Sequence, residues 1–197
     1  MPVRRFKTLL LAVALASAAA ACSSSDGRTL PLPNPRNTTT SVSAPVVGQP
    51  SEDRASEIFT LESPAFAQLA PIPPRHTCSG VGVSPPLTWA STPPEAVELA
   101  IVVRDRSAGG FVHWTVTGID PAVQGIGEGG LPEGAYEARN DGGTVGWFAP
   151  CPPAGSTHTY LFSIHALTAP MKLGSTLTPA AAAAAVERAS ASHAELI

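Results

Sequence analysis

Four apolar stretches along the chain predict its main strands. Residues 99–103 form a continuous run of Leu, Ala, Ile and Val, which is typical of a strand covered on both faces. Residues 111–119 and 160–167 alternate between apolar and polar positions, and residues 58–61 form a shorter apolar stretch. Clusters of Pro and Gly separate these stretches, so the pattern predicts a mainly β domain with long ordered loops.

One helix is predicted near the C-terminus, at residues 180–195. Thr178 can cap it, Pro179 suits the first helical position, and the alanines that follow are strong helix formers. Because its apolar face consists mostly of methyl groups, we expect it to pack against the sheet in a structural role.

The first 21 residues have the pattern of a secretory signal peptide. Arg4, Arg5 and Lys7 precede an apolar run and a stretch of small residues that ends at Cys22. The apolar run is too short to span a bilayer comfortably as a helix. We therefore expect residues 1–21 to be removed on export.

Cys22 follows three alanines and resembles the cysteine of the bacterial lipobox, which is lipidated and becomes the mature N-terminus. The usual Leu three residues earlier is Ala19 here, so ordinary secretory cleavage and a secreted protein remain the alternative. Residues 22–56 are rich in Ser and Pro and poor in aromatic residues, which predicts a flexible tether. Residues 57–197 then suit one domain with a single core, held on the extracytoplasmic side of the cell membrane by the lipid.

Charge excludes one class of partner. The formal net charge is −3, and without Arg4, Arg5 and Lys7 nine basic residues face fifteen acidic ones, a balance of −6. No basic stripe remains for nucleic acid, and attraction to anionic lipid surfaces would be poor. Membrane residence would have to come from the lipid.

Three sequence motifs in the predicted domain carry a family resemblance. PRHTCSGVGVSPPLTW, at residues 74–89, is similar to the Y-T-C-D-G-x-N-x-S-P-P-L-x-W signature of bacterial phosphatidylethanolamine-binding proteins, also called Raf kinase inhibitor-like proteins. FVHW at residues 111–114 and APCPPAGSTHTY at residues 149–160 resemble that family's F-x-H-W and G-P-C-P-P-x-G-x-H-R-Y elements, in the same order. The resemblance implies an antiparallel β-sandwich that binds ligands without enzymatic activity.

The resemblance also implies a small anion-binding pocket at one end of the sandwich. Asp105 matches the first Asp of the family's D-P-D-x-P element, His113 the His of H-W, and His158 and Tyr160 the ends of H-R-Y, while Pro150 lies in the proline-rich rim. The chemistry agrees, because two imidazoles can donate hydrogen bonds to a phosphate-like oxygen, especially when protonated. Asp105 can hold one of them in the donating tautomer. The expected ligand is a small anionic group such as a phospholipid headgroup.

Several positions depart from the family pattern. The second Asp and the prolines of D-P-D-x-P are absent. Elsewhere the usual Tyr, Asp, Asn and Arg are replaced, in that order, by His76, Ser79, Gly82 and Thr159. These changes bear on which ligand fits, because selectivity rests on a few placed polar groups.

Cys78 and Cys151 are the cysteines that remain after Cys22, and both lie in Pro- and Gly-rich segments of the expected pocket wall. Export to an oxidising compartment favours a disulfide between them, with two buried thiols as the alternative.

Three other functions compete with ligand binding. The family resemblance also implies inhibitors of kinases or proteases that act through the surface around the pocket. A hydrolase triad could use Asp105 and His113 with Ser84 or Ser107, yet no G-x-S-x-G elbow frames a serine. A zinc site lacks any recognised ligand spacing, although four residues could contribute to one: His76, Cys78, His113 and His158. We therefore expect neither an enzyme nor a metal or other cofactor.

Overall fold

The computed structural model describes residues 58–197. The predicted signal peptide and the whole of the predicted tether, Cys22 included, therefore lie outside the described residues. Within residues 58–197, no helix is long and apolar enough to cross a membrane. The domain contains two antiparallel sheets and one α-helix, which confirms the predicted fold class.

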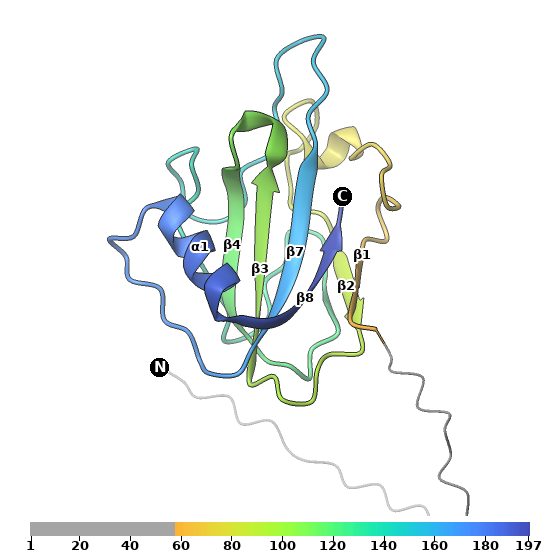
Figure 1. The fold of residues 1–197 in the computed structure, drawn as a ribbon. Helices are drawn as coiled ribbons and strands as arrows, with labels where there is room; N and C mark the ends of the chain where they lie inside the picture. The colour runs from red at the N-terminus through yellow and green to blue at the C-terminus, as the bar shows by residue number, and fades with distance from the viewer. Residues whose placement is uncertain (1–57) are drawn as a thin grey trace, which may run out of the picture. The chain divides into compact units, whose positions relative to one another are not determined.

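The larger sheet has five strands in the order β6-β4-β3-β7-β8, and the smaller has three in the order β1-β2-β5. Figure 1 shows α1 lying over one face of the larger sheet, with β1 and β2 beyond its other face. The helix is α1 (Pro179–Ala189), and two short 3₁₀ turns are η1 (Pro74–His76) and η2 (Arg106–Ala108). The strands are β1 (Thr60–Glu62), β2 (Leu87–Ala90), β3 (Glu98–Asp105), β4 (Phe111–Ile119), β5 (Gly125–Ile126), β6 (Tyr136–Glu137), β7 (Tyr160–Leu167) and β8 (Ser190–Leu196).

Strand β3 is the centre of the core because both of its faces are covered, as the unbroken apolar run predicts. Leu99, Ile101 and Val103 join the cluster between the two sheets, whereas Ala100 and Val102 join the cluster under α1. All five are fully buried. Removal of this apolar surface from water is the main stabilising contribution to such a layered domain.

The predicted helix at residues 180–195 is wrong in its second half. The helix ends at Ala189, and Ser190–Leu196 forms β8, which pairs antiparallel with β7. Alanine propensity favours continued helix, but Ala194 and Leu196 alternate with exposed neighbours and are buried in the main core. Cross-strand pairing and burial therefore override the local preference.

The antiparallel order brings several chain segments to one end of the larger sheet. Strand β3 ends at Asp105, which is paired with Phe111 at the start of β4 and with Tyr160 at the start of β7. The proline-rich segment before β7 projects beyond this end (Figure 1). The residues of the predicted site are thus gathered by the strand register.

Candidate functional site

Asp105 organises this end of the sheet through both of its carboxylate oxygens. It is 3% exposed, and its Oδ1 accepts hydrogen bonds from the amides of Ser107 and Ala108 at 2.8 and 3.1 Å. These bonds cap the η2 turn. Its Oδ2 lies 2.6 Å from Nδ1 of His158. One buried carboxylate therefore fixes both the turn and the imidazole.

His158 is the part of this pair that reaches solvent, with a side chain 18% exposed. Since the carboxylate only accepts, Nδ1 carries the hydrogen. Nε2 is then an acceptor in the neutral ring and a donor only in the protonated ring. The tautomer that Asp105 holds thus donates to an anion only after protonation, a restriction that sequence alone did not reveal.

The backbone beside His158 is fastened to η2 by two further bonds. The Arg106 amide donates to the Thr159 carbonyl at 2.8 Å, and the Thr159 amide donates to Ser107 Oγ at 2.9 Å. Ser107, considered above as a hydrolase nucleophile, here has its hydroxyl oxygen engaged in holding the loop. Its contribution is to position His158.

His113, on β4, is 4% exposed and lies among aromatic rings. Its Nδ1 is 2.7 Å from the Phe148 carbonyl, to which it donates. Burial lowers the pKa of His113, an effect that the Phe148 carbonyl and the charges of Asp105 and Asp141 only partly offset. The ring is therefore neutral at neutral pH, with its lone pair on Nε2.

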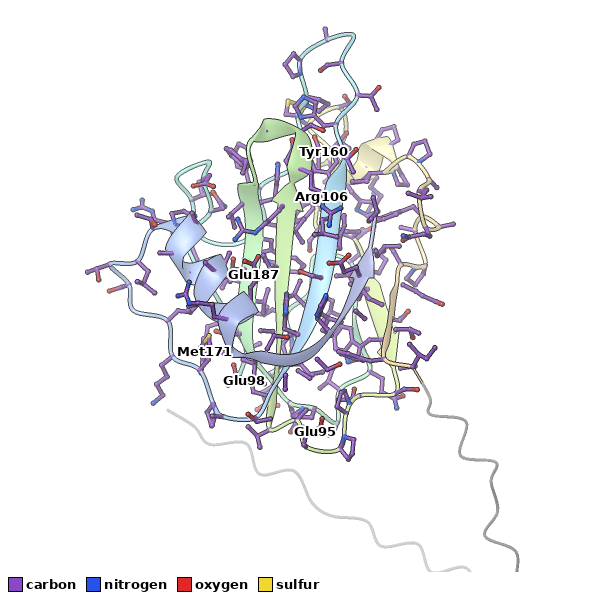
Figure 2. All side chains as sticks on the ribbon, in the orientation of Figure 1. Glu95, Glu98, Arg106, Tyr160, Met171 and Glu187 are labelled. Atoms are coloured by element: carbon purple, nitrogen blue, oxygen red, sulfur yellow. A yellow bond between two sulfur atoms is a disulfide. The ribbon has the colours of Figure 1, made fainter. Side chains whose placement is uncertain are left out.

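Tyr160 lies against both imidazoles. Its ring centroid is 5.3 Å from that of His113, edge-on, and 6.4 Å from that of His158, nearly parallel. Figure 2 shows Tyr160 at the same end of the sheet as Arg106. Burial, together with the charge of Asp105, raises the pKa of Tyr160 to about 12. The hydroxyl therefore stays protonated, and it is enclosed near the Asp105 carboxylate.

A cavity of about 380 Å³ adjoins this cluster. His158, Tyr160 and Pro150 line it, whereas Asp105 and His113 lie outside the lining and contact His158 and Tyr160. Four hydroxyl side chains add to its polar wall: Thr77, Ser156, Thr157 and Thr159. Its apolar wall consists of residues that sequence reasoning missed: Phe66, Leu69, Ala70, Pro71, Ile72, Phe162 and Ile197. These are ordinary apolar side chains from distant segments, so no local signal singled them out.

Cys78 and Cys151 form a disulfide that closes a separation of 73 residues. The Cys78 amide also donates to the Pro150 carbonyl at 3.0 Å, so two bonds join the η1 segment to the proline-rich segment. Thr77, Pro150 and Pro152 beside the two cysteines line the cavity. The disulfide thus ties two walls of the cavity together.

The disulfide bears on the zinc alternative. Cys78 is not a free thiol, and His76 is buried with Nδ1 3.0 Å from the Val83 carbonyl. In the part of the chain that the structure describes, no group of three or more His, Cys, Asp or Glu side chains is placed to hold a metal ion.

Comparison with known proteins gives the family. The model of the family described as phosphatidylethanolamine-binding protein matches residues 62–197. The chain belongs to the phosphatidylethanolamine-binding protein family. The sequence resemblance is thereby confirmed.

Relatives in this phosphatidylethanolamine-binding family include bacterial proteins of similar extent. A Mycobacterium tuberculosis protein named "Putative lipoprotein LppC" is 44% identical over 146 residues, which cover 73% of this chain and 72% of the relative. The UPF0098 protein Rv1910c of the same organism is 37% identical over 147 residues, covering 74% and 72%.

Two solved structures of family members share the fold. The Escherichia coli protein YbcL has a TM-score of 0.65 and 28% identity, and the match covers 70% of this chain and 94% of YbcL. The homologue CT736 from Chlamydia trachomatis has a TM-score of 0.63 and 33% identity over the same shares of the two chains.

Proposed function

We propose that this protein is an exported, lipid-anchored binding protein whose pocket takes a phosphate or another small anionic group, such as a phospholipid headgroup. The observation that supports the proposal best is the Asp105–His158 pair, 2.6 Å apart, at a cavity that His158 shares with Tyr160. A catalytic role is not part of the proposal.

The chemistry of the cavity favours a small polar ligand held at one end. When protonated, His158 presents a charged donor at Nε2, and the buried Asp105 carboxylate stabilises that charge from the opposite side. The hydroxyls of Thr157 and Thr159 can donate as well. Those of Thr77 and Ser156 already donate to the Pro74 and Pro153 carbonyls. A cavity of about 380 Å³ suits a small ligand rather than a long chain.

The anchor is proposed from the N-terminal sequence. Cys22 follows a secretory signal pattern, residues 22–56 have the composition of a tether, and the relative LppC is named as a lipoprotein. Residues 57–197 would then be held outside the cell membrane as one ligand-binding domain.

Titration with phosphoethanolamine tests the binding function. The imidazole NMR signals of His113 and His158 should shift as the ligand saturates the site, and His158→Ala and Asp105→Asn should each weaken binding without unfolding the domain. His193→Ala is the matched control, because His193 lies on β8 with a side chain 54% exposed. Unchanged imidazole signals at millimolar ligand would contradict the proposal.

The exposed proline-rich segment favours an interaction protein as the second candidate. Residues 153–157 at the rim are all exposed and project beyond the sheet, where an inhibitory surface for a kinase or protease could form. Partners captured equally by the wild type and by His158→Ala would support this function over ligand binding.

A further inference from the structure

Strand β8 forms one edge of the larger sheet, and it is the longest edge strand of the two sheets. The other edge strands, β1, β5 and β6, have three residues or fewer. Edge strands in natural proteins are often protected by Lys, Pro or a short length, because their unpaired backbone groups can pair with another chain. Ser190–Leu196 contains neither Lys nor Pro. The outer side of β8 therefore lacks the usual protection.

The contacts of Ile197 show which backbone groups of β8 point outward. Its amide donates to Gln68 Oε1 at 2.9 Å and its carbonyl accepts from the Leu69 amide, so both groups point away from β7. Successive residues of an antiparallel strand direct their backbone groups to opposite sides. The backbone groups of Glu195 and His193 therefore point outward as well, and no hydrogen bond from residues 58–197 reaches them on that side.

A hollow of about 730 Å³ lies along this outer side. Ala194, Glu195 and Leu196 form its wall on β8, and residues 59–68 form the opposite wall. Figure 1 shows β1, which belongs to that opposite wall, beyond the outer edge of β8. The linings of this hollow and of the cavity at His158 share Phe66 alone, so the two are separate sites.

The lining of the hollow combines apolar and acidic side chains. Leu61, Phe66 and Leu196 belong to the core between the two sheets and form its apolar wall. Both charged residues of the lining, Glu62 and Glu195, are exposed acids. The lining thus favours a ligand with apolar and basic groups.

The two acids are poorly neutralised by the protein itself. Glu195 lies 3.8 Å from Arg106 and 3.7 Å from His193, both longer than a hydrogen bond. Among residues 58–197, no cation pairs with Glu62. A basic side chain in the hollow would therefore gain attraction that the folded chain leaves unused.

We propose that β8 and this hollow form a docking site for an extended segment of a partner protein in which apolar and basic residues alternate. The segment pairs with Glu195 and His193 and so continues the pairing that Gln68 and Leu69 begin at Ile197. Side chains of an extended segment alternate between two faces. One set then lies against the apolar wall, and the basic set lies on the face from which Glu195 projects. The docking site does not depend on the proposed anion pocket.

A labelled peptide of four Val-Lys repeats is the probe, titrated into the full chain at low salt and followed by fluorescence anisotropy. It should bind saturably, and the same peptide with Glu in place of Lys should bind about tenfold more weakly or worse, because like charges then meet at the rim. Phosphoethanolamine should not displace the probe, since the anion pocket is a separate cavity.

Methylation of the peptide amides tests the pairing with β8. Alternate amides of a strand point to opposite edges, so either the Lys amides or the Val amides donate to β8. Of two peptides, one methylated at every Lys amide and one at every Val amide, one should therefore lose about tenfold in affinity and the other should keep it. The amides of Glu195 and His193 should also exchange their hydrogens about tenfold more slowly, or slower still, when the unmodified peptide is bound.

Variants of the protein test the contribution of charge. Glu62→Gln and Glu195→Gln should each weaken binding of the Val-Lys peptide about threefold, as expected for exposed ion pairs. Glu133→Gln is the matched control, because Glu133 is an exposed acid outside the lining, and it should bind as the wild type does. Thermal melting checks that each variant is folded.

Several results would overturn the docking site. Absence of saturable binding by the Val-Lys peptide would remove it, and equal affinity for the Lys and Glu peptides would remove the preference for a basic segment. Equal behaviour of the two methylated peptides would exclude pairing with β8. Slow exchange of the Glu195 and His193 amides in the protein alone would show that residues 1–57 or a second copy already cover the edge, and sedimentation velocity would tell these two apart.

Discussion

Two buried carboxylates at opposite ends of β3 differ in what they hold. Asp105 holds a turn and an imidazole beside the cavity. Glu98 is 5% exposed, and its two oxygens accept hydrogen bonds from the amides of Gly118 and Met171 at 2.8 and 2.9 Å. Figure 2 shows Glu98 close to Met171 and far from Tyr160. Glu98 therefore joins β3 to β4 and to the segment before α1.

Glu98→Gln should destabilise the domain by about 1–3 kcal/mol. The amide group keeps the shape of the carboxylate, but its NH₂ cannot accept, so one buried backbone N–H loses its partner. Urea denaturation measures the change. Glu95→Gln, at an exposed position of the preceding loop, is the matched control and should change stability by less than about 0.5 kcal/mol. Equal midpoints for the two variants would refute the role of Glu98.

The sequence predicts some of these functional and structural residues but not others. Asp105, His113, His158 and Tyr160 stood out because His, Asp and Tyr occurred in recognisable motifs. Glu98 did not, because its partners are backbone amides that only the folded chain brings to it. The tautomer of each imidazole was equally hidden, since a carbonyl or a carboxylate decides it.

The observed strands agree with the predicted ones where a long stretch is buried on both faces or alternates between buried and exposed positions. Strands β4 and β7 coincide with the predicted stretches, and β3 extends its prediction at both ends. Strands β5 and β6 have two residues each and β2 has four, too few for a period to emerge. The change from α1 to β8 was missed because a run of alanines favours helix, whereas the edge of β7 decides the pairing.

Strand β8 is joined to β7 through a pair of histidines. His165 and His193 are cross-strand partners with ring centroids 5.6 Å apart. The nitrogens of His165 lie 2.9 and 3.1 Å from the hydroxyl oxygens of Ser163 and Ser190. Burial, then the neighbouring His193, lowers the pKa of His165 to about 4.

Acid should therefore weaken this domain. Because the unfolded chain protonates His165 near its ordinary pKa of 6.5 and the folded chain only near 4, the unfolded state binds more protons between these values. Stability falls as the pH drops through that window, by about 3 kcal/mol at most from this group. Denaturation at pH 7, 5.5 and 4.5 measures the slope.

A His165→Gln variant tests the origin of this acid sensitivity. It should make the free energy of unfolding depend less on pH. His193→Gln should only narrow the pH window of acid sensitivity, because removing the repulsive His193 brings the pKa of folded His165 closer to its ordinary value. An unchanged slope in His165→Gln would assign the effect to other groups.

The Cys78–Cys151 disulfide is the second feature that joins distant elements. Opening the link between Cys78 and Cys151 frees a loop of 73 residues in the unfolded chain. In the chain-entropy description, freeing a loop of this length lowers the free energy of unfolding by about 3–5 kcal/mol. The Cys78→Ser/Cys151→Ser double variant should melt at a lower temperature and bind anions more weakly, because only the backbone hydrogen bond from residue 78 to the Pro150 carbonyl then joins the two cavity walls. Unaltered melting and affinity would contradict this expectation.

In the proposed function, the whole molecule combines a layered domain with a separate lipid attachment. Residues 22–197 carry nine basic and fifteen acidic residues, a balance that provides no electrostatic attraction to anionic bilayers. Attachment in the proposed function therefore depends on Cys22.

Cys22→Ser should release the protein from the membrane. Wild-type protein is expected in the detergent phase of a detergent partition and the variant in the aqueous phase, with the same affinity for phosphate in both because the domain is unaltered. Ser24→Ala is the matched control and should stay in the detergent phase. Wild-type protein in the aqueous phase would instead support ordinary secretory cleavage.

The position of Ile197, directly after β8, has a practical consequence for binding measurements. Ile197 lines the cavity, and its carbonyl accepts a hydrogen bond from the amide of Leu69, which lines the cavity as well. A segment fused after Ile197 would therefore begin at the cavity lining. A purification tag fused there would compete with small molecules for entry, so affinities should be measured on protein whose tag has been cleaved or placed ahead of β1.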